Sequence, residues 1–540
     1  MNKNKIITPL PNSTLIVDSD SGVYLQIRDF LIKFSELEKS PKHIHTYKIT
    51  SVSLWNAAAA GITSQEIIHF LEKYSKQDLP EEVVNNVEKQ INNYGKIKLI
   101  RKDGKMLLYS DDKKLLRTIK KRKEIKKLLK NNFEINEIYR GKIKIELMKL
   151  GYPVEDLCGF EDGELFQIDT KKVIKKSERF EIRDYQREAI DSFSGDGVVV
   201  LPCGAGKTIV GIGTIVKLKT SALIICPSQV SVKQWISEII EKTTVKEKDV
   251  GEYTSGNKEI APITVTTYQM LTFKKEGKFP HLSLFNRRDW GLIIYDEVHL
   301  LPAQVFKETA NLQAKRRLGM TATFIREDGK EKEIFTLIGP KRYESPWKEI
   351  EGKGWIAEAE CYEIRVPLEK SLRIEYIKAD GKEKYKIASQ NPLKYEVVKE
   401  IVKKYEGEKI LIIGQYIAQL KKITRELNAP LITGKTPNEE RIKLYEMFKN
   451  DGLKLLVVSK VANFSIDLPD ANLAIQISGT FGSRQEEAQR LGRILRPKNG
   501  KKAKFCSIVT KNTKDQEMNA KRQLFLTEQG YLYNIVDFKR

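Results

Sequence analysis

A glycine-rich loop contains the residues of this sequence that could most directly perform chemistry. Residues 198–201 are apolar and predict a buried strand, Pro202-Cys203-Gly204-Ala205-Gly206-Lys207-Thr208 follows, and a helix begins at Ile209. Backbone N–H groups of such a loop, together with the helix N-terminus, can bind a triphosphate. We expect Lys207 to reach the β- and γ-phosphates and Thr208 to ligate Mg²⁺. Leu201 replaces the first glycine of the strict phosphate-loop pattern, but Gly204 and Gly206 still permit the turn. The loop residues predicted to bind nucleotide are Cys203, Gly204, Ala205, Gly206, Lys207 and Thr208.

An acidic pair follows a second apolar run. Residues 292–295 predict a buried strand that ends in Asp296-Glu297-Val298-His299. Acids at the carboxyl end of such a strand lie where an α/β sheet presents its ligand groups. Asp296 is therefore expected to hold Mg²⁺ through water, and Glu297 to orient or deprotonate an attacking water. The alternative is a surface acid pair that caps the next helix.

A third segment whose residue types could take part in catalysis is Gln489-Arg490-Leu491-Gly492-Arg493-Ile494-Leu495-Arg496. On a helix, Gln489, Arg493 and Arg496 share one face. The guanidinium groups of Arg493 and Arg496 can neutralise charge that develops on a γ-phosphoryl group. The alternative is a basic helix that faces water. In the catalytic interpretation, ATP lies between two lobes and its hydrolysis is coupled to lobe closure.

The elements that must position these groups are short apolar strands that alternate with helices after Arg183. The strands lack strict alternation, as expected of parallel strands buried on both faces. Their number suggests two sheets in two lobes, with a break near Pro346. The predicted strands are residues 198–201, 223–226, 263–266, 292–295, 410–413, 455–458, 473–477 and 505–509.

The N-terminal region has a different pattern. Helical patterns over residues 54–60, 64–74 and 81–94 precede a hairpin of residues 97–100 and 106–109, an order that resembles a winged-helix module. Residues 113–130 predict a basic amphipathic helix. Its cationic face is either a solvated surface or a contact for nucleic-acid phosphates. A linker is expected near residues 171–176.

Composition narrows the class of protein. Lys and Arg total 95 and Asp and Glu total 72 among 540 residues, so the formal net charge is +23, which favours a polyanionic partner such as nucleic acid. Apolar residues make up 40%, enough for ordinary cores. No run approaches the roughly 18 apolar residues of a membrane span, and the start lacks a secretory pattern. The scattered cysteines and histidines form no metal or disulfide pattern. We therefore expect a cytoplasmic protein without a membrane partner.

These motifs resemble those of superfamily two helicases, and specifically the XPB family of DNA repair and transcription helicases, over residues 183–536. Arg183-Asp184-Tyr185-Gln186 resembles the motif that reads adenine, Thr321-Ala322-Thr323 the motif that links nucleotide state to strand binding, and the segment with Asp467 motif V. Arg326-Glu327-Asp328 resembles the loop that this family uses at a duplex fork. Ser228, Thr266 and Thr267 follow strand ends in the manner of strand-binding motifs, although a helix cap is the alternative for each hydroxyl.

The resemblance implies an α/β fold with two tandem RecA-like parallel-sheet lobes after a mostly helical, winged-helix-like N-terminal domain. The expected domains are residues 1–175, with a damage-recognition-like segment, 176–345 and 346–540, with a thumb-like insertion near 371–393. It also implies a DNA helicase or translocase with 3′→5′ polarity that uses ATP and Mg²⁺ in repair or transcription-linked DNA opening. Single-stranded, forked or damaged duplex DNA is the expected partner, with a nuclease or repair protein as a further one. A duplex translocase and an ATP-switched DNA-binding scaffold remain alternatives. The residues that the resemblance assigns to these roles are Arg183, Gln186 and Asp467 for nucleotide, and Ser228, Thr266, Thr267, Arg326, Glu327 and Asp328 for DNA.

Overall fold

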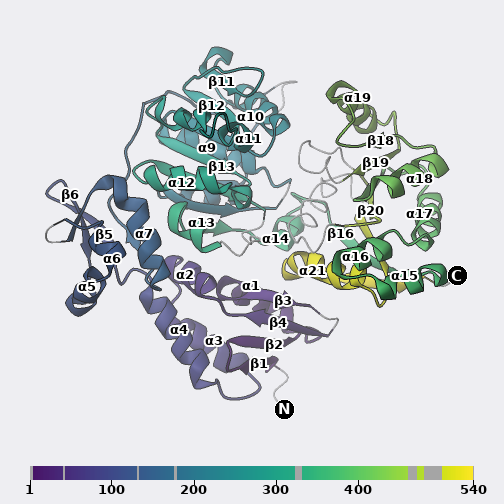
Figure 1. Cartoon of the computed structure of the whole chain (residues 1–540), viewed down its shortest axis with the longest axis horizontal. Helices are drawn as coiled ribbons and strands as arrows, with labels where there is room; N and C mark the ends of the chain where they lie inside the picture. Colours follow the sequence, from purple (N-terminus) through teal and green to yellow (C-terminus); the bar gives the residue numbers. More distant parts are fainter. Residues whose placement is uncertain are drawn as a thin grey trace. The chain divides into compact units, whose positions relative to one another are not determined.

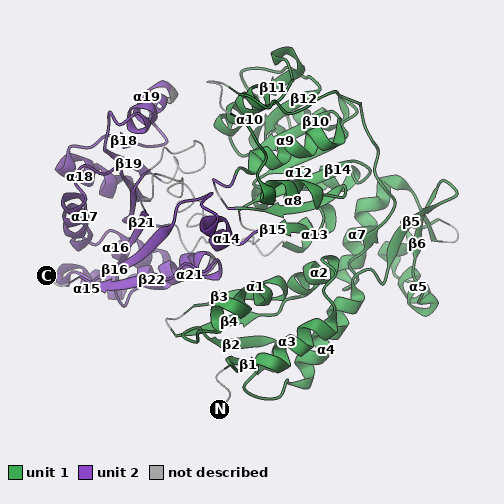
Figure 2. Ribbon diagram, turned by 180° about the vertical axis from the view of Figure 1, so that it is seen from behind, with its two compact units in different colours: residues 1–201, 206–344 green, residues 202–205, 345–540 purple. Residues whose placement is uncertain are grey.

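The computed structural model describes most of the chain as two compact units. The described residues are 4–40, 43–130, 133–174, 179–202, 204–322, 331–459, 471–479 and 502–538. Unit 1 comprises residues 1–201 and 206–344, and unit 2 comprises residues 202–205 and 345–540 (Figure 2). None of the described helices is both long and apolar enough to cross a bilayer.

The central sheet of unit 1 has seven parallel strands in the order β11-β12-β10-β13-β14-β9-β15. Its helices lie around the sheet in Figure 1, and Leu223, Ile225, Ile293 and Tyr295 form part of the core. This arrangement is the RecA-like lobe predicted for the phosphate loop. Its elements are α8(Asp184–Asp191), β9(Asp196–Val200), α9(Lys207–Leu218), β10(Ala222–Cys226), α10(Gln229–Lys242), β11(Val250–Tyr253), β12(Ile263–Thr267), α11(Tyr268–Leu271), β13(Leu292–Asp296), α12(Ala303–Asn311), β14(Arg316–Thr321), α13(Glu331–Leu337) and β15(Lys341–Glu344).

Unit 2 contains a second seven-stranded parallel sheet, in the order β18-β19-β17-β20-β21-β16-β22. The eight predicted strands are confirmed, four in each parallel sheet, as is the α/β class with two such lobes. Residues 371–393, expected to form a thumb-like insertion, fold mainly into α15 and α16. The elements are α14(Trp347–Gly352), β16(Ala359–Val366), α15(Arg373–Lys378), α16(Gly381–Ser389), α17(Leu393–Lys404), β17(Ile410–Gly414), α18(Ile417–Leu427), β18(Leu431–Ile432), α19(Asn438–Lys449), β19(Leu455–Ser459), β20(Leu473–Gln476), β21(Ala503–Thr510), α21(Lys514–Glu528) and β22(Tyr533–Asp537).

The N-terminal part of unit 1 differs from the predicted winged-helix arrangement, which is not confirmed. The three helices and the hairpin exist, but the helices lie beside an antiparallel sheet of order β1-β2-β4-β3 that we did not predict. The hairpin instead belongs to a second small sheet, β7-β6-β5-β8, with its own core against α5, α6 and α7. The first group of elements is β1(Ile7–Leu10), β2(Thr14–Asp18), α1(Tyr24–Phe34), β3(Glu36–Lys39), β4(Ile44–Lys48), α2(Ser51–Ala59), α3(Ser64–Tyr74) and α4(Glu81–Asn93). The second is β5(Lys98–Lys102), β6(Lys105–Tyr109), α5(Lys113–Lys120), α6(Lys123–Lys126), β7(Glu134–Ile135), α7(Arg140–Lys149) and β8(Glu155–Asp156).

The single basic helix predicted over residues 113–130 is instead two short helices. Leu116 and Ile119 on α5 and Ile125 and Leu128 on and after α6 all enter one core. Ile119 and Ile125 are six residues apart, which places them on different faces of a straight helix with 3.6 residues per turn. A break after Lys120 is therefore required if both apolar pairs are to be buried, and the basic side chains other than that of Lys120 are exposed.

A buried ionic cluster joins the second small sheet to the central sheet of unit 1. Arg140 donates to both carboxylate oxygens of Asp156 at 2.9 Å. Lys144 donates to Asp156 at 3.3 Å and to Gln313 of the RecA-like lobe at 2.9 Å. The Arg140, Lys144 and Asp156 side chains are at most 4% exposed. This region therefore packs against the RecA-like lobe through charges that compensate one another away from water.

Removing the single acid of this cluster is expected to destabilise the protein strongly. In Asp156→Asn, two buried cations lose their counter-charge, so the free energy of unfolding should fall by about 3–5 kcal/mol. Burial acts to raise the pKa of Asp156, but Lys144 and Arg140 outweigh it and hold that pKa below its ordinary value. The stabilisation is therefore present near neutral pH and is lost as the pH falls through the folded-state pKa. Urea denaturation at neutral and acidic pH measures both effects.

The neighbouring residue provides the control for this prediction. Glu155 is 34% exposed and pairs with Lys98 at 2.9 Å, so Glu155→Gln should cost less than about 1 kcal/mol. Equal losses in the two variants would contradict a special role for the buried cluster.

Candidate active site

The carboxyl ends of β9, β13 and β14 bring the predicted catalytic groups together in unit 1. The phosphate loop follows β9, and Lys207 is the first residue of α9. Gly206, which caps α9, has a φ of 77°, a left-handed conformation that suits glycine. Lys207 Nζ lies 3.5 Å from Glu297 Oε1, at the end of β13. Residues that are distant in sequence thus meet at one edge of the sheet.

The acidic pair is half-buried and held by neighbouring side chains. Trp235 Nε1 on α10 donates to Asp296 Oδ2 at 3.1 Å, and the Tyr268 hydroxyl donates to the Asp296 carbonyl at 3.0 Å. Glu297 adopts a left-handed φ of 50° at the start of the 3-10 turn Val298–Leu300. The Glu297 side chain makes no capping hydrogen bond to this turn, so the pair does not act as the cap that the alternative describes.

The two carboxyl groups differ in their electrostatics. Burial and the neighbouring Glu297 carboxylate raise the pKa of Asp296. Burial also acts to raise the pKa of Glu297, but the charge of Lys207 outweighs it and the net shift is downward. One ammonium therefore serves two half-buried acids, and the site retains negative charge that a divalent cation could neutralise. Thr208, in the first turn of α9, and Asp296 are the residues suited to such an ion.

A histidine connects the acidic pair to the end of β14. His299 Nδ1 lies 2.8 Å from Thr321 Oγ1 and 3.4 Å from Glu297 Oε2. His299 and Thr321 are both buried. We did not predict a role for His299 or Trp235. The sequence signal for His299 was its position two residues after Glu297, and Trp235 had none.

The segment predicted to read adenine lies against the phosphate loop. Gln186 is buried, and a β-carbon added to Gly206 would meet its Nε2 at 2.5 Å. The Arg183 backbone N–H donates to Gln186 Oε1 at 3.0 Å, and Arg183 Nη1 donates to the Tyr185 hydroxyl at 3.1 Å. Gly204 is exposed and Ala205 is buried. Gln186 is thus fixed beside the start of α9.

The hydroxyls predicted to contact DNA have local roles. Ser228 accepts from the Ser231 N–H as the cap of α10, and Thr267 accepts from the Met270 N–H as the cap of α11. Thr266 is fully buried and donates to the Tyr253 carbonyl at 2.7 Å. The cap alternative therefore describes Ser228 and Thr267, and the Thr266 hydroxyl bonds within the sheet interior.

The remaining predicted site residues lie outside the described part of the chain. They are Cys203, Arg326, Glu327, Asp328, Asp467, Gln489, Arg493 and Arg496.

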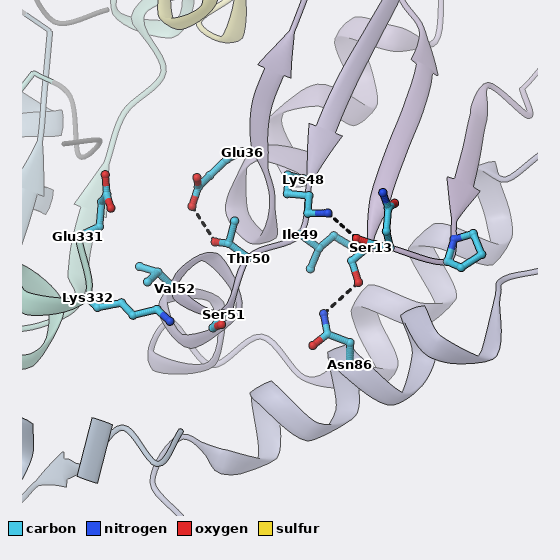
Figure 3. Close-up of a pocket in the computed structure, with 12 residues that line it drawn as sticks. Ser13, Glu36, Lys48, Ile49, Thr50, Ser51, Val52, Asn86, Glu331 and Lys332 are labelled. Carbon is cyan, nitrogen blue, oxygen red and sulfur yellow. Dashed lines mark hydrogen bonds between the residues drawn. The ribbon is translucent and has the colours of Figure 1, made fainter. Parts of the chain in front are cut away.

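A polar groove elsewhere in unit 1 is less suited to chemistry. It has a volume of about 490 Å³ and lies between the first small sheet, α2, α4 and the start of α13 (Figure 3). Its polar groups satisfy one another: Thr50 donates to Glu36 at 2.7 Å, and Asn86 donates to Ser13 at 3.1 Å. The converging acids and ammonium at β9 and β13 remain the better candidate.

Comparison with known proteins gives similarities over the whole chain. Residues 350–539 match the family model "ERCC3/RAD25/XPB C-terminal helicase", residues 179–326 match "Type III restriction enzyme, res subunit", and residues 8–134 match "Helicase conserved C-terminal domain". The "DNA 3'-5' helicase XPB" of Kineococcus radiotolerans is 46% identical over 98% of this chain and 97% of its own. The protein with that name from Mycobacterium tuberculosis is 47% identical over 98% of each chain. The Saccharomyces cerevisiae "General transcription and DNA repair factor IIH helicase/translocase subunit XPB/SSL2" is 31% identical over 97% of this chain and 71% of its own.

Proposed function

The chain belongs to the XPB family of DNA helicases, and from that premise we propose that it hydrolyses ATP to translocate along and unwind DNA with 3′→5′ polarity. The observation that carries this proposal is the meeting of Lys207, Glu297 and Asp296 at one sheet edge, in a chain that matches named helicases almost end to end. The polarity is that in the relatives' names.

Each group at this edge has a distinct role in the proposal. Lys207 holds the β- and γ-phosphates of the substrate ATP. Glu297, held ionised by Lys207, orients the attacking water and accepts its proton. Gln186 contacts the base, and Arg183 supports this segment. Thr208 and Asp296 would hold Mg²⁺, whose charge stabilises the phosphates when it is bound.

His299 and Thr321 connect this chemistry to DNA. Thr321 ends β14 and is followed closely in sequence by Arg326, Glu327 and Asp328, the residues we propose for the fork. Because His299 lies 2.8 Å from Thr321 and 3.4 Å from Glu297, a change at the γ-phosphate can alter the start of the fork segment. We propose that this connection couples nucleotide state to strand binding.

The second lobe supplies the remaining groups. We propose that Arg493 and Arg496 stabilise the transferring phosphoryl group, that Gln489 supports them on the same helix face, and that Asp467 contributes to the nucleotide site. Repair or transcription-linked DNA opening is the proposed setting, with a nuclease or repair protein as a partner and the cytoplasm as the compartment.

The proposal is tested by ATP turnover with no DNA and with single-stranded, duplex or forked DNA, together with strand displacement on forks of each polarity. We expect turnover to rise with DNA and the 3′-tailed fork to be opened. Turnover that does not respond to any DNA would contradict the proposal. DNA-stimulated turnover without displacement would favour a duplex translocase.

The basic surface of α5 and α6 is proposed as a phosphate contact, and its removal gives a second test. Replacing four exposed cations with glutamine should lower the affinity for duplex DNA at least about tenfold near 0.1 M salt. The slope of log affinity against log salt concentration should also become less steep by about one or more, because fewer phosphate contacts release fewer counterions on binding. Fluorescence anisotropy at several salt concentrations measures this. The four residues are Lys121, Arg122, Lys126 and Lys127.

A charge-matched variant provides the control. It replaces four exposed lysines of α17 and α18, Lys403, Lys404, Lys421 and Lys422, with glutamine. If both variants lose the same affinity, the α5–α6 surface is only a solvated face and net charge explains the effect.

A further inference from the structure

A basic turn, residues 272–279, follows α11 in unit 1 and has a defined backbone. Lys275 and Lys278 exchange two backbone hydrogen bonds, each 2.9 Å long. Glu276 and Gly277 between them have φ values of 50° and 79°, which is the conformation of a tight two-residue hairpin. The basic turn is therefore a built element whose tip projects between two paired residues.

The basic turn is anchored at both of its ends. Before it, Met270 and Leu271 of α11 belong to the hydrophobic core of the lobe. After it, Leu284 and Phe285 of the 3-10 helix Pro280–Asn286 belong to the same core. The position of the basic turn on the surface is therefore fixed by apolar packing on each side.

Two aromatic rings lie at the base of this turn. Phe273 is 52% exposed, and its ring centroid lies 5.9 Å from that of His281. His281 Nδ1 lies 2.9 Å from the hydroxyl of Tyr253, a buried residue at the end of β11. A single exposed apolar side chain is common, but here a second ring is held beside it. Together the two rings offer an aromatic surface at a fixed place.

Positive charge surrounds these rings. Burial and the charges of Lys258 and Arg287 lower the pKa of His281, so its imidazole is neutral near pH 7. Within the described part of the chain, the cations around the rings form no ion pair, so their charge is available to a polyanion. The five exposed cations are Lys258, Lys274, Lys275, Lys278 and Arg287.

The strand order places this surface away from the nucleotide groups but at the same edge of the sheet. The parallel strands β11 and β12, next to each other in Figure 1, have their carboxyl ends at the edge where β9 and β13 present Lys207 and Glu297. β12 is four positions from β9, which is roughly 19 Å at the usual spacing of strands. A ligand at the rings would therefore be a different one from ATP.

We infer that Phe273 and His281 form a stacking site for an unpaired base of DNA, and that Lys274, Lys275 and Lys278 bind the neighbouring phosphates. The inference rests on the proposed function and deepens it, because it states how a DNA strand is held. Every base has a face that can stack on an aromatic ring, so the site should not distinguish sequences. In duplex DNA the bases stack on one another, so only the lysines would contribute to duplex binding.

Phe273→Ala is the sharpest test, because the ring is exposed and its removal should not disturb the core. Affinity for a single strand of thymidine nucleotides should fall about fivefold or more, while affinity for a duplex of the same length stays within about twofold. Phe273→Trp should keep the affinity of the wild type. Fluorescence anisotropy without nucleotide measures these values. Leu165→Ala is the matched control, because Leu165 is 76% exposed and pairs with Thr220 before β10, at the opposite edge of the sheet.

A strand of abasic nucleotides separates stacking from other effects of the substitution. Wild-type protein should bind this strand more weakly than the thymidine strand, and Phe273→Ala should bind it as well as the wild type does. Lys275→Gln with Lys278→Gln should instead weaken binding of the thymidine and abasic strands alike and flatten the salt dependence. Lys246→Gln with Lys248→Gln, at exposed lysines directly before β11, should leave both affinities within about twofold.

The outcomes that overturn the inference are distinct from those that overturn the proposed function. Wild-type affinity of Phe273→Ala for the thymidine strand would overturn the inference. Equal losses for the thymidine strand, the abasic strand and the duplex would also overturn it, since the ring would then contact no base. ATP turnover of the wild type that does not respond to DNA would instead contradict the proposed function, and the binding measurements would still decide whether the stacking site exists.

Discussion

Lys207→Ala is expected to abolish DNA-stimulated ATP hydrolysis, with a fall in kcat of at least about 10³-fold. The lysine is the only cation among the described residues within ion-pairing distance of Glu297 apart from His299, and its Nζ lies 3.5 Å from that carboxylate. Its removal takes away a phosphate contact and also the charge that keeps Glu297 ionised. Steady-state turnover at saturating DNA and a range of ATP concentrations measures the loss.

Lys217 provides the matched control for this variant. It lies on the same helix, α9, and pairs with Asp191 at 3.4 Å near the surface, so Lys217→Ala should keep turnover within about twofold. Retained turnover in Lys207→Ala would reject the site. If Lys207→Ala no longer hydrolyses ATP yet still supports partner recruitment and repair, the DNA-binding scaffold is favoured over the helicase as the function.

Strands buried on both faces were predictable, whereas strands with polar residues were not. The sequence of residues 223–226 is Leu-Ile-Ile-Cys and that of residues 410–413 is Ile-Leu-Ile-Ile, and both segments are strands. β14 begins with Arg316-Arg317, which reads as a loop. Arg317 is nevertheless fully buried, because its guanidinium donates to the carbonyls of Leu337 and Gln313 at 2.8 Å. Tertiary partners therefore made a strand from a segment with no periodic signal.

The small N-terminal sheets were missed for a related reason. Pro9 interrupts β1, and the buried face of β4 consists of His45 and Tyr47, so neither strand shows an alternating apolar pattern. Their pairing also needs contacts between segments that are distant in sequence, such as Thr14 with Lys48. The hairpin at residues 98–109 was predictable because its turn is local, with Asp103 and Gly104 both at positive φ.

The residues of the candidate site that belong to a recognisable sequence pattern could be predicted. A phosphate loop between a strand and a helix, and an acid pair at a strand end, identify Lys207, Asp296 and Glu297 without coordinates. The support of these residues is different, because Trp235 and His299 are ordinary residues until the fold places them 3.1 Å from Asp296 and 3.4 Å from Glu297. Supporting residues therefore need the structure.

Arg493→Ala is the prediction that tests the two-lobe mechanism most directly. Charge develops on the γ-phosphoryl oxygens only as the bond to the leaving group breaks, so a guanidinium from the second lobe acts mainly in the transition state. We therefore expect kcat to fall about 10³-fold or more while ATP binding stays within a few-fold. Stopped-flow binding of a fluorescent ATP analogue and steady-state turnover separate the two quantities. Arg425→Ala, at an exposed arginine of α18, is the control and should leave both unchanged. Lys207 and Arg493 come from different lobes. Similar losses of turnover, with weaker ATP binding only in Lys207→Ala, would therefore indicate that hydrolysis requires both lobes. Normal turnover in Arg493→Ala would confine catalysis to the first lobe alone.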